Sequence, residues 1–148
     1  FGRDQAGMGV TFMSFGFKNG VPRETDLMFD VRFLQNPHYD PQLRPLTGLD
    51  QAVGDAVSAD VDFDSFLNRL QQLLKLTLPR YEQEGKSHLT VAIGCTGGRH
   101  RSVFIAETLA KWQDETGNWP VHVYHRDLPV DETGANEGTD NQGMGKRK

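Results

Sequence analysis

A glycine-containing loop joins an apolar segment to a helix-forming segment, and its residues could hold an anion. The sequence there runs Val91-Ala92-Ile93-Gly94-Cys95-Thr96-Gly97-Gly98-Arg99-His100-Arg101-Ser102. Gly97 and Gly98 allow the backbone to approach a ligand closely, so that successive N–H groups can converge on phosphate oxygens. The positive end of the dipole of the following helix adds to this attraction. With the bidentate guanidinium of Arg101, the segment predicts a site for a phosphate or a carboxylate.

The spacing of Cys95 and Arg101 also allows a catalytic interpretation. Five residues separate them and Ser102 follows, as in cysteine-dependent phosphatases. In that chemistry a thiolate attacks phosphorus, and an aspartic acid, for which Asp30 and Asp127 are candidates, protonates the leaving oxygen. Against this interpretation, Gly94 stands where such phosphatases carry a histidine, and a small buried residue at the end of a strand is a competing role for Cys95. The loop lacks the spacing of a nucleoside triphosphate site, so we expect no hydrolysis of that kind.

The composition fits one globular domain, with 148 residues, 36% of them hydrophobic and 24% charged. A net charge of −4 argues against a strongly basic, non-specific nucleic-acid binder. The single cysteine excludes an internal disulfide, and the five histidines lack the spacing of a zinc motif, so we expect no metal and no cofactor. No apolar stretch approaches the ~18 residues of a membrane span and no secretory signal is present, so we expect a cytoplasmic protein. Because the chain begins with Phe1, we expect it to be cut from a longer protein.

The hydrophobic pattern predicts four strands and two long helices. Segments rich in β-forming residues predict strands over 10–15, 27–32, 88–94 and 121–124. Apolar residues at three- and four-residue spacing predict a helix after the capping candidates Asp60 and Asp62, which Pro79 should kink or end. A second helix is expected over about 99–115, with Gly117 near its end. Three prolines and Gly48 predict an irregular loop over 34–49, of a length that often carries function.

Together these elements predict an α/β fold, a small mixed sheet of about four strands covered by helices, with an anion-binding strand-loop-helix. The first two strands are candidates for an antiparallel pair. We expect a domain over residues 9–128. Residues 129–148 are glycine-rich and acidic until they close with Lys146-Arg147-Lys148, and we expect a disordered tail there.

Four segments, in order, resemble the C-terminal domain of the RapZ family, the bacterial RNase adapter proteins. They are 14–18, 29–38, 43–50 and 93–103, and the resemblance extends from about Met13 to Leu128. It implies a noncatalytic sensor and adapter domain that senses glucosamine-6-phosphate and binds small regulatory RNA, with RNA-processing proteins as partners. A homo-oligomer is also compatible with the sequence. Family members usually carry an N-terminal nucleotide-binding domain, and its hydrolysis is not carried over to this segment.

The resemblance also implies which residues form the two binding sites. The effector pocket should draw on Asp30, His38, Cys95, Thr96, Gly97, Gly98 and Arg101. Of these, the loop residues would take the phosphate, while Asp30 and His38 would orient the sugar hydroxyls or the amine. From the sequence alone, a pair with Arg32 explains Asp30 equally well. The candidates for RNA phosphate contacts are Lys18, Arg32, Arg44, Arg99 and the basic C-terminus, and we expect RNA and the sugar phosphate to compete.

Overall fold

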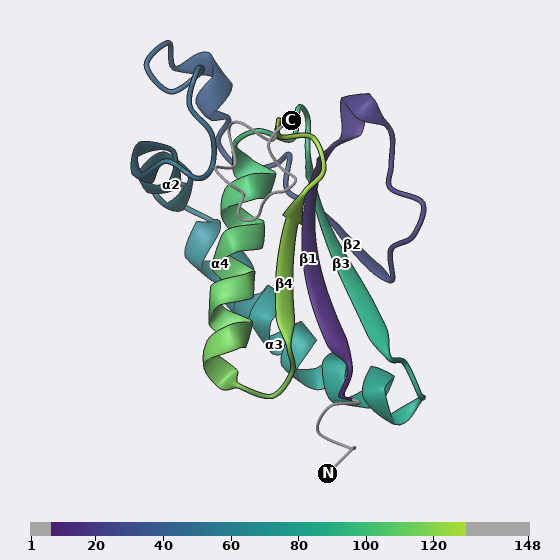
Figure 1. Ribbon diagram of the computed structural model, residues 1–148. Coiled ribbons are helices and arrows are strands. Elements are labelled where there is room, and N and C mark those ends of the chain that lie inside the picture. The colour runs from purple at the N-terminus through teal and green to yellow at the C-terminus, as the bar shows by residue number, and fades with distance from the viewer. Residues whose placement is uncertain (1–6, 130–148) are drawn as a thin grey trace.

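In the computed structural model, which describes residues 7–129, strands and helices follow one another along the chain as in other α/β proteins (Figure 1). The strands are β1 (Gly9–Gly16), β2 (Leu27–Asp30), β3 (His88–Cys95) and β4 (Val121–His125). The helices are α2 (Gln51–Ser58), α3 (Phe63–Gln83) and α4 (Arg101–Thr116), with short 3-10 turns η1 (Phe17–Asn19) and η2 (Pro37–Tyr39).

The four strands form one sheet in the order β2-β3-β1-β4, and every neighbouring pair is parallel. Val10 of β1 lies beside Leu89 of β3 on one side and beside Val121 of β4 on the other. The α/β class and the four strands are thus confirmed, whereas a mixed sheet was wrong. β1 and β2 do not pair because β3 lies between them, a long-range arrangement that local patterns do not reveal.

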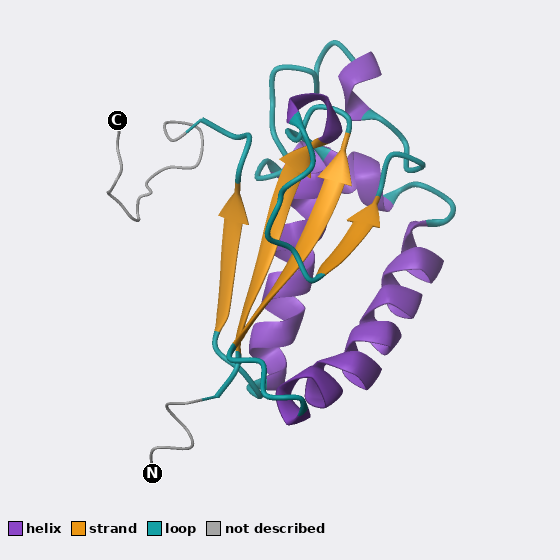
Figure 2. Cartoon of the chain, turned by 90° about the vertical axis from the view of Figure 1, so that its right-hand side faces the viewer, coloured by secondary structure: helices purple, strands orange, loops and turns teal. Residues whose placement is uncertain are grey.

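Alternate residues of the central strands face the helices and form the main core. Phe12 and Ile93 are fully buried there against Leu74 of α3 and Leu109 of α4. Burying one such side chain contributes about 1.5–3 kcal/mol. In Figure 2 the helices lie behind the sheet, while the connection from β1 to β2 crosses in front of it. The predicted cover of helices therefore applies to one face of the sheet.

The helices differ from the prediction in two places. Helix α2 was not predicted, because its eight residues include Gly54 and directly follow a proline-rich segment for which the sequence predicts a loop. Helix α3 continues through Pro79 to Gln83 rather than ending there. Tyr81 packs against the core beyond the proline, and this contact offsets the hydrogen bond that Pro79 cannot donate.

The other predicted helix boundaries were close to the observed ones. Asp62 is the N-cap residue of α3, although its side chain makes no capping hydrogen bond. Gly117 ends α4 with a left-handed φ of 73°. The predicted disordered tail, from residue 130 on, lies outside the described residues.

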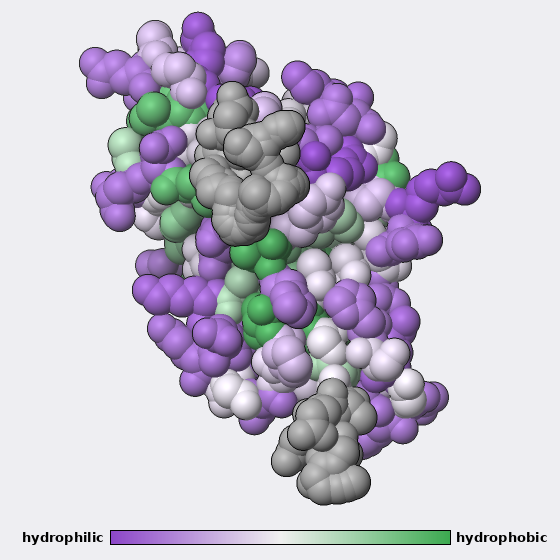
Figure 3. Space-filling view, in the orientation of Figure 1, coloured by the Kyte–Doolittle hydropathy of each residue, from purple (hydrophilic) through white to green (hydrophobic). Residues whose placement is uncertain are grey.

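Polar side chains dominate the molecular surface seen in Figure 3, apart from a hydrophobic patch near the middle of the view, where Figure 1 places β4. Val123 of this edge strand is 40% exposed. Within residues 7–129, no helix is both long enough and apolar enough to span a bilayer. In the same range, no group of three or more histidine, cysteine, aspartate and glutamate side chains is arranged to hold a metal ion.

Candidate functional site

The glycine loop, residues 96–100, runs from the end of β3 to the start of α4 and folds against the end of β1. Gly98 has a φ of +78°, a conformation that a side chain disfavours. A Cβ atom on Gly16 would lie 2.4 Å from the carbonyl carbon of Gly97, so the two backbones touch. The N–H of Lys18 donates to the carbonyl of Thr96 over 3.1 Å. Backbone packing therefore fixes the loop at the ends of two adjacent parallel strands.

This edge of the sheet is where ligands bind in parallel α/β folds. β1 and β3 are neighbours, and the connections that follow them leave on opposite faces of the sheet (Figure 2). A crevice forms at such a point because neither connection covers it. The topology thus places the predicted anion loop at the most favourable position for a ligand.

The segment after β2, residues 31–50, forms the opposite wall, drawn in blue at the upper left of Figure 1. The N–H of Gly48 donates to the carbonyl of Arg99 over 2.8 Å. Nε2 of His100 donates to the carbonyl of Arg44 over 3.2 Å. Burial lowers the pKa of His100 below its ordinary value, so the ring is neutral near pH 7. Two hydrogen bonds therefore join the loop to the wall.

A pocket of about 550 Å³ lies between the loop and this wall. The volume falls within the range of small-molecule sites, about 300–1,000 Å³. Among residues 7–129, no aspartate or glutamate lines it. Its lining does contain four basic side chains, those of Lys18, Arg44, Arg99 and Arg101. This charge distribution suits an anionic ligand.

Most of the predicted site residues lie in this one pocket. Five of the seven predicted effector residues line it, namely His38, Cys95, Thr96, Gly97 and Arg101. Lys18, Arg44 and Arg99, predicted for RNA, line the same pocket. Gly98, Asp30 and Arg32 are not part of the lining. Two sets of residues that were predicted separately therefore share one cavity.

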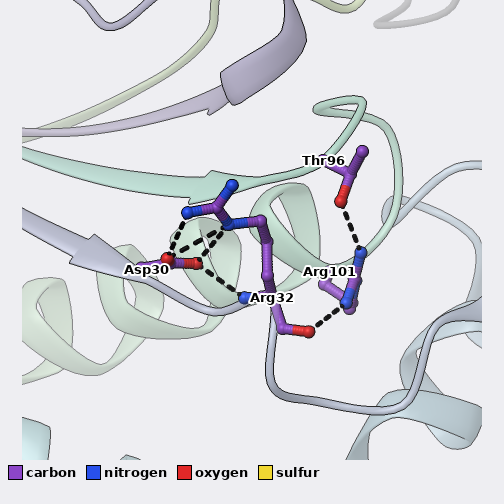
Figure 4. A network of polar contacts seen from close by, with 4 residues as sticks. All are labelled: Asp30, Arg32, Thr96 and Arg101. Atoms are coloured by element: carbon purple, nitrogen blue, oxygen red, sulfur yellow. Dashed lines mark hydrogen bonds and ion pairs between the residues drawn. The ribbon is translucent and has the colours of Figure 1, made fainter.

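Arg32 is hydrogen-bonded to Asp30, as Figure 4 shows, and neither residue lines the pocket. The guanidinium of Arg32 donates to both carboxylate oxygens over 2.7–3.1 Å and also lies 3.9 Å from the centre of the Phe17 ring. The hydrogen bonds from Arg32 hold the pKa of Asp30 below its ordinary value. Both side chains are 47% exposed, so the pair contributes little to stability. The structure thus contains the pair that the sequence offered as the alternative to ligand binding.

Arg101 is almost completely buried, with 4% of its surface exposed, and its side chain links the two walls (Figure 4). One terminal nitrogen donates to the carbonyls of Arg32 and Leu34 over 2.7 and 3.0 Å. The other contacts Oγ1 of Thr96 over 3.4 Å. Nε is buried and has no hydrogen-bond partner among the described residues. Within residues 7–129 the hydrogen bonds of this guanidinium go to carbonyl and hydroxyl oxygens rather than to a carboxylate. Such a buried charge is costly, and a bound anion would offset this cost.

Cys95 lies beneath the loop and is paired with the first turn of α4. Its thiol donates to Oγ of Ser102 over 3.1 Å, and the N–H of Ser102 donates back to the sulfur over 3.4 Å. Only 2% of Cys95 is exposed. The thiol thus forms part of the buried floor of the pocket.

The sequence that builds this site matches a known family. The family model described as the RapZ C-terminal domain matches residues 8–129. The chain belongs to this family. The matched range covers most of the chain.

Relatives of this RapZ domain are named nucleotide-binding proteins. One from Rhodospirillum rubrum is 61% identical over 121 residues, which cover 82% of the chain and 38% of that protein. Another, from Paramagnetospirillum magneticum, is 56% identical over 129 residues, 87% of the chain and 41% of the relative. A third, from Rubrobacter xylanophilus, is 55% identical over 122 residues, which cover 80% of the chain and 40% of that protein. The chain thus spans about two fifths of the length of the relatives it matches.

Three residues that line this pocket were not predicted, namely Asn36, Tyr39 and His100. His100 was not singled out from the loop sequence, because its burial depends on the distant segment after β2. Asn36 and Tyr39 flank the proline and histidine of a turn whose fold could not be read from local pattern. Their signal was their position on both sides of His38, a predicted site residue.

Proposed function

We propose that this domain is a noncatalytic sensor that binds an amino-sugar phosphate, of the glucosamine-6-phosphate type, in the pocket between the glycine loop and residues 31–50. The observation that carries the proposal is a cationic pocket that includes the buried guanidinium of Arg101 and that no carboxylate of the described residues lines. A cytoplasmic setting, where sugar phosphates are formed, fits this function.

The phosphate would lie against the glycine loop. Thr96 and Gly97 line the pocket there, and Lys18 of η1 lines it beside them. The nearest side-chain atoms to a Cβ on Gly97 would be those of Lys18, at 3.9 Å, so this side of the loop is open to a ligand. His38 would contact a sugar hydroxyl from the opposite wall. Asp30 would reach the amine only if Arg32 exchanged its partner, because Arg32 now occupies both carboxylate oxygens.

Arg101 contributes to this site in another way than the bidentate contact with a phosphate that the sequence predicted. Three of its five N–H groups donate to protein oxygens, so the N–H of Nε and the second N–H of the nitrogen that contacts Thr96 are left for an anion. Its main contributions are then its positive charge and the link between the walls. The field of a buried charge acts over several ångströms in a poorly screened environment.

RNA would bind at the same basic edge, through phosphate contacts from Lys18, Arg44 and Arg99, and RNA-processing proteins would be recruited with it. These three side chains line the pocket that the sugar phosphate would occupy. The two ligands would therefore compete. We expect saturating sugar phosphate to weaken RNA binding and RNA affinity to fall steeply with salt.

The geometry favours this function over a cysteine-dependent phosphatase. Cys95 is buried and hydrogen-bonded to Ser102, and Arg101 is directed to carbonyl groups. The acid candidate Asp127 accepts the N–H of Gly16 over 2.6 Å. Although burial acts to raise the pKa of Asp127, hydrogen bonds from Arg126 and Gly16 bring it below its ordinary value. An ionised carboxylate cannot protonate a leaving oxygen.

Calorimetry with glucosamine-6-phosphate and with glucosamine tests the proposal. We expect the phosphate ester to bind and glucosamine to bind at least about tenfold more weakly, because charge-assisted hydrogen bonds contribute about 1.5–3 kcal/mol. Lys18→Ala should weaken only the binding of the ester. Lys86→Ala is the matched control, since Lys86 pairs with Asp26 beside the start of β3, away from the pocket. Equal affinity for the two compounds would remove the phosphate role of the loop.

Cys95→Ser separates the sensor from the phosphatase. A panel of phosphomonoesters should show no turnover with the native chain, and the variant should still bind glucosamine-6-phosphate. Turnover that disappears with the substitution would show that the thiol is a nucleophile and would contradict the noncatalytic function.

A further inference from the structure

The mouth of the pocket carries an aromatic ring that the sugar phosphate does not require. Tyr39, the last residue of η2, lines the pocket and is 79% exposed. Its ring contacts the ring of His38 edge to face, with centroids 5.9 Å apart. Most large aromatic side chains of this domain are at least partly buried in a core cluster, whereas Tyr39 belongs to neither cluster. Its position is therefore not explained by packing.

The turn that carries Tyr39 is held by hydrogen bonds on both sides. The N–H of His38 donates to Oδ1 of Asn36 over 3.0 Å, and the N–H of Asp40 donates to the carbonyl of Pro37 over 3.0 Å. Nε of Arg44 donates to the carbonyl of His38 over 2.7 Å. Pro37 is buried beneath the turn. Because these hydrogen bonds already hold the turn in place, its backbone loses little conformational entropy when a ligand binds to the ring.

The proposed phosphate-binding groups and this ring come from different segments that line one pocket. Lys18 lies beside Gly97 of the glycine loop, and the turn after β2 contributes His38 and Tyr39. A pocket of about 550 Å³ also leaves room beyond a phosphate group. Flat nucleobases stack on exposed aromatic side chains, and this interaction tolerates any base. A phosphate joined through a sugar to a flat ring would therefore use both segments.

We propose that the pocket holds one nucleoside monophosphate unit, with its phosphate at the glycine loop and its base stacked on Tyr39. This inference rests on the proposed phosphate role of the loop and adds a subsite for the base. The unit is either a free nucleotide or one nucleotide of a single-stranded RNA. In both cases Arg44 and Arg99 supply the surrounding positive charge.

Binding of three compounds by calorimetry tests the base subsite: adenosine monophosphate, ribose 5-phosphate and adenosine. Adenosine monophosphate should bind most tightly. Tyr39→Ala should weaken it about 5- to 150-fold, because stacking contributes that much per base, and should leave ribose 5-phosphate unchanged. Tyr39→Phe should retain the affinity. Tyr124→Ala is the matched control, since Tyr124 is 55% exposed on β4 and does not line the pocket.

Each contrary result has a distinct meaning. Equal affinities for adenosine monophosphate and ribose 5-phosphate, or an equal loss of both in Tyr39→Ala, would overturn the base subsite and leave the phosphate site standing. No binding of ribose 5-phosphate together with adenosine as tight as its monophosphate would overturn the phosphate role itself.

A short single-stranded oligoadenylate distinguishes the two sources of the nucleotide. Tighter binding than the monomer, lost with Tyr39→Ala and decreasing steeply with salt, would support an RNA strand as the ligand. Binding weaker than that of the monomer would support a free nucleotide.

Discussion

Single side chains in this site take their roles from where the rest of the chain places them. Arg101 reads in the sequence as a free cation beside a glycine loop, yet three of its hydrogen bonds go to Thr96 and to two carbonyls after β2. In the sequence His100 is a second basic residue beside it. In the structure its ring is buried and neutral and donates a hydrogen bond to the carbonyl of Arg44. Burial turns both residues from surface charges into links between the walls of the pocket.

Replacing His100 tests this role through pH. Burial lowers the pKa of His100, so the folded chain takes up this proton only at a pH below the ordinary value near 6.5. The unfolded chain then binds more protons, and the folding stability decreases as the pH falls below about 6.5. His100→Gln keeps an N–H donor but does not titrate. We expect the variant to lose less stability than the native chain between about pH 7 and 5.5 in urea unfolding. An identical decrease in both proteins would contradict a neutral buried ring.

At the scale of elements, the approach of the glycine loop to β1 sets the shape of the site. Gly16 has an ordinary φ of −108°, so it is not required for its conformation. It is required because an added Cβ would overlap the backbone of Gly97 at 2.4 Å. Backbone cannot move aside as a flexible side chain can. The loop therefore keeps its position only while residue 16 has no side chain.

Gly16→Ala should push the loop away from β1. We expect a destabilisation of about 1–3 kcal/mol and a clear loss of glucosamine-6-phosphate affinity. Gly85→Ala provides the control, since Gly85 has a φ of +98° and open space around it, in the turn before β3. It should cost about 1 kcal/mol from its conformation alone and leave binding unchanged. Unfolding curves and calorimetry on both variants give the comparison, and equal losses of affinity would contradict a direct role of the close contact.

At the scale of the whole molecule, the pocket is closed by segments that are distant in sequence. The carbonyls of Arg32 and Leu34 accept hydrogen bonds from the guanidinium of Arg101, and the backbone of Gly48 packs against the carbonyl of His100. A ligand that touches both walls would add contacts between these segments only in the folded state. Its binding should therefore stabilise the domain as a unit.

Thermal unfolding with and without glucosamine-6-phosphate measures this effect. At a concentration near one hundred times Kd, we expect about 2.7 kcal/mol of added stability and an increase in Tm of roughly 5–15 °C. Glucosamine at the same concentration should have a much smaller effect. An unchanged Tm at saturating ester would instead favour a domain that serves only as an assembly module.

The sequence alone determined the local features of this protein, because they depend on short-range chemistry. The four strands, α4 and its end at Gly117, and the glycine loop after β3 follow from apolar periodicity and glycine conformations. The resemblance to the RapZ C-terminal domain added His38 and Asp30 as candidates, of which His38 lines the pocket and Asp30 does not. Tertiary structure decided the parallel strand order, the helix α2 and the carbonyl partners of Arg101. These depend on contacts between segments far apart in the chain, where packing and burial rather than local preference select the arrangement.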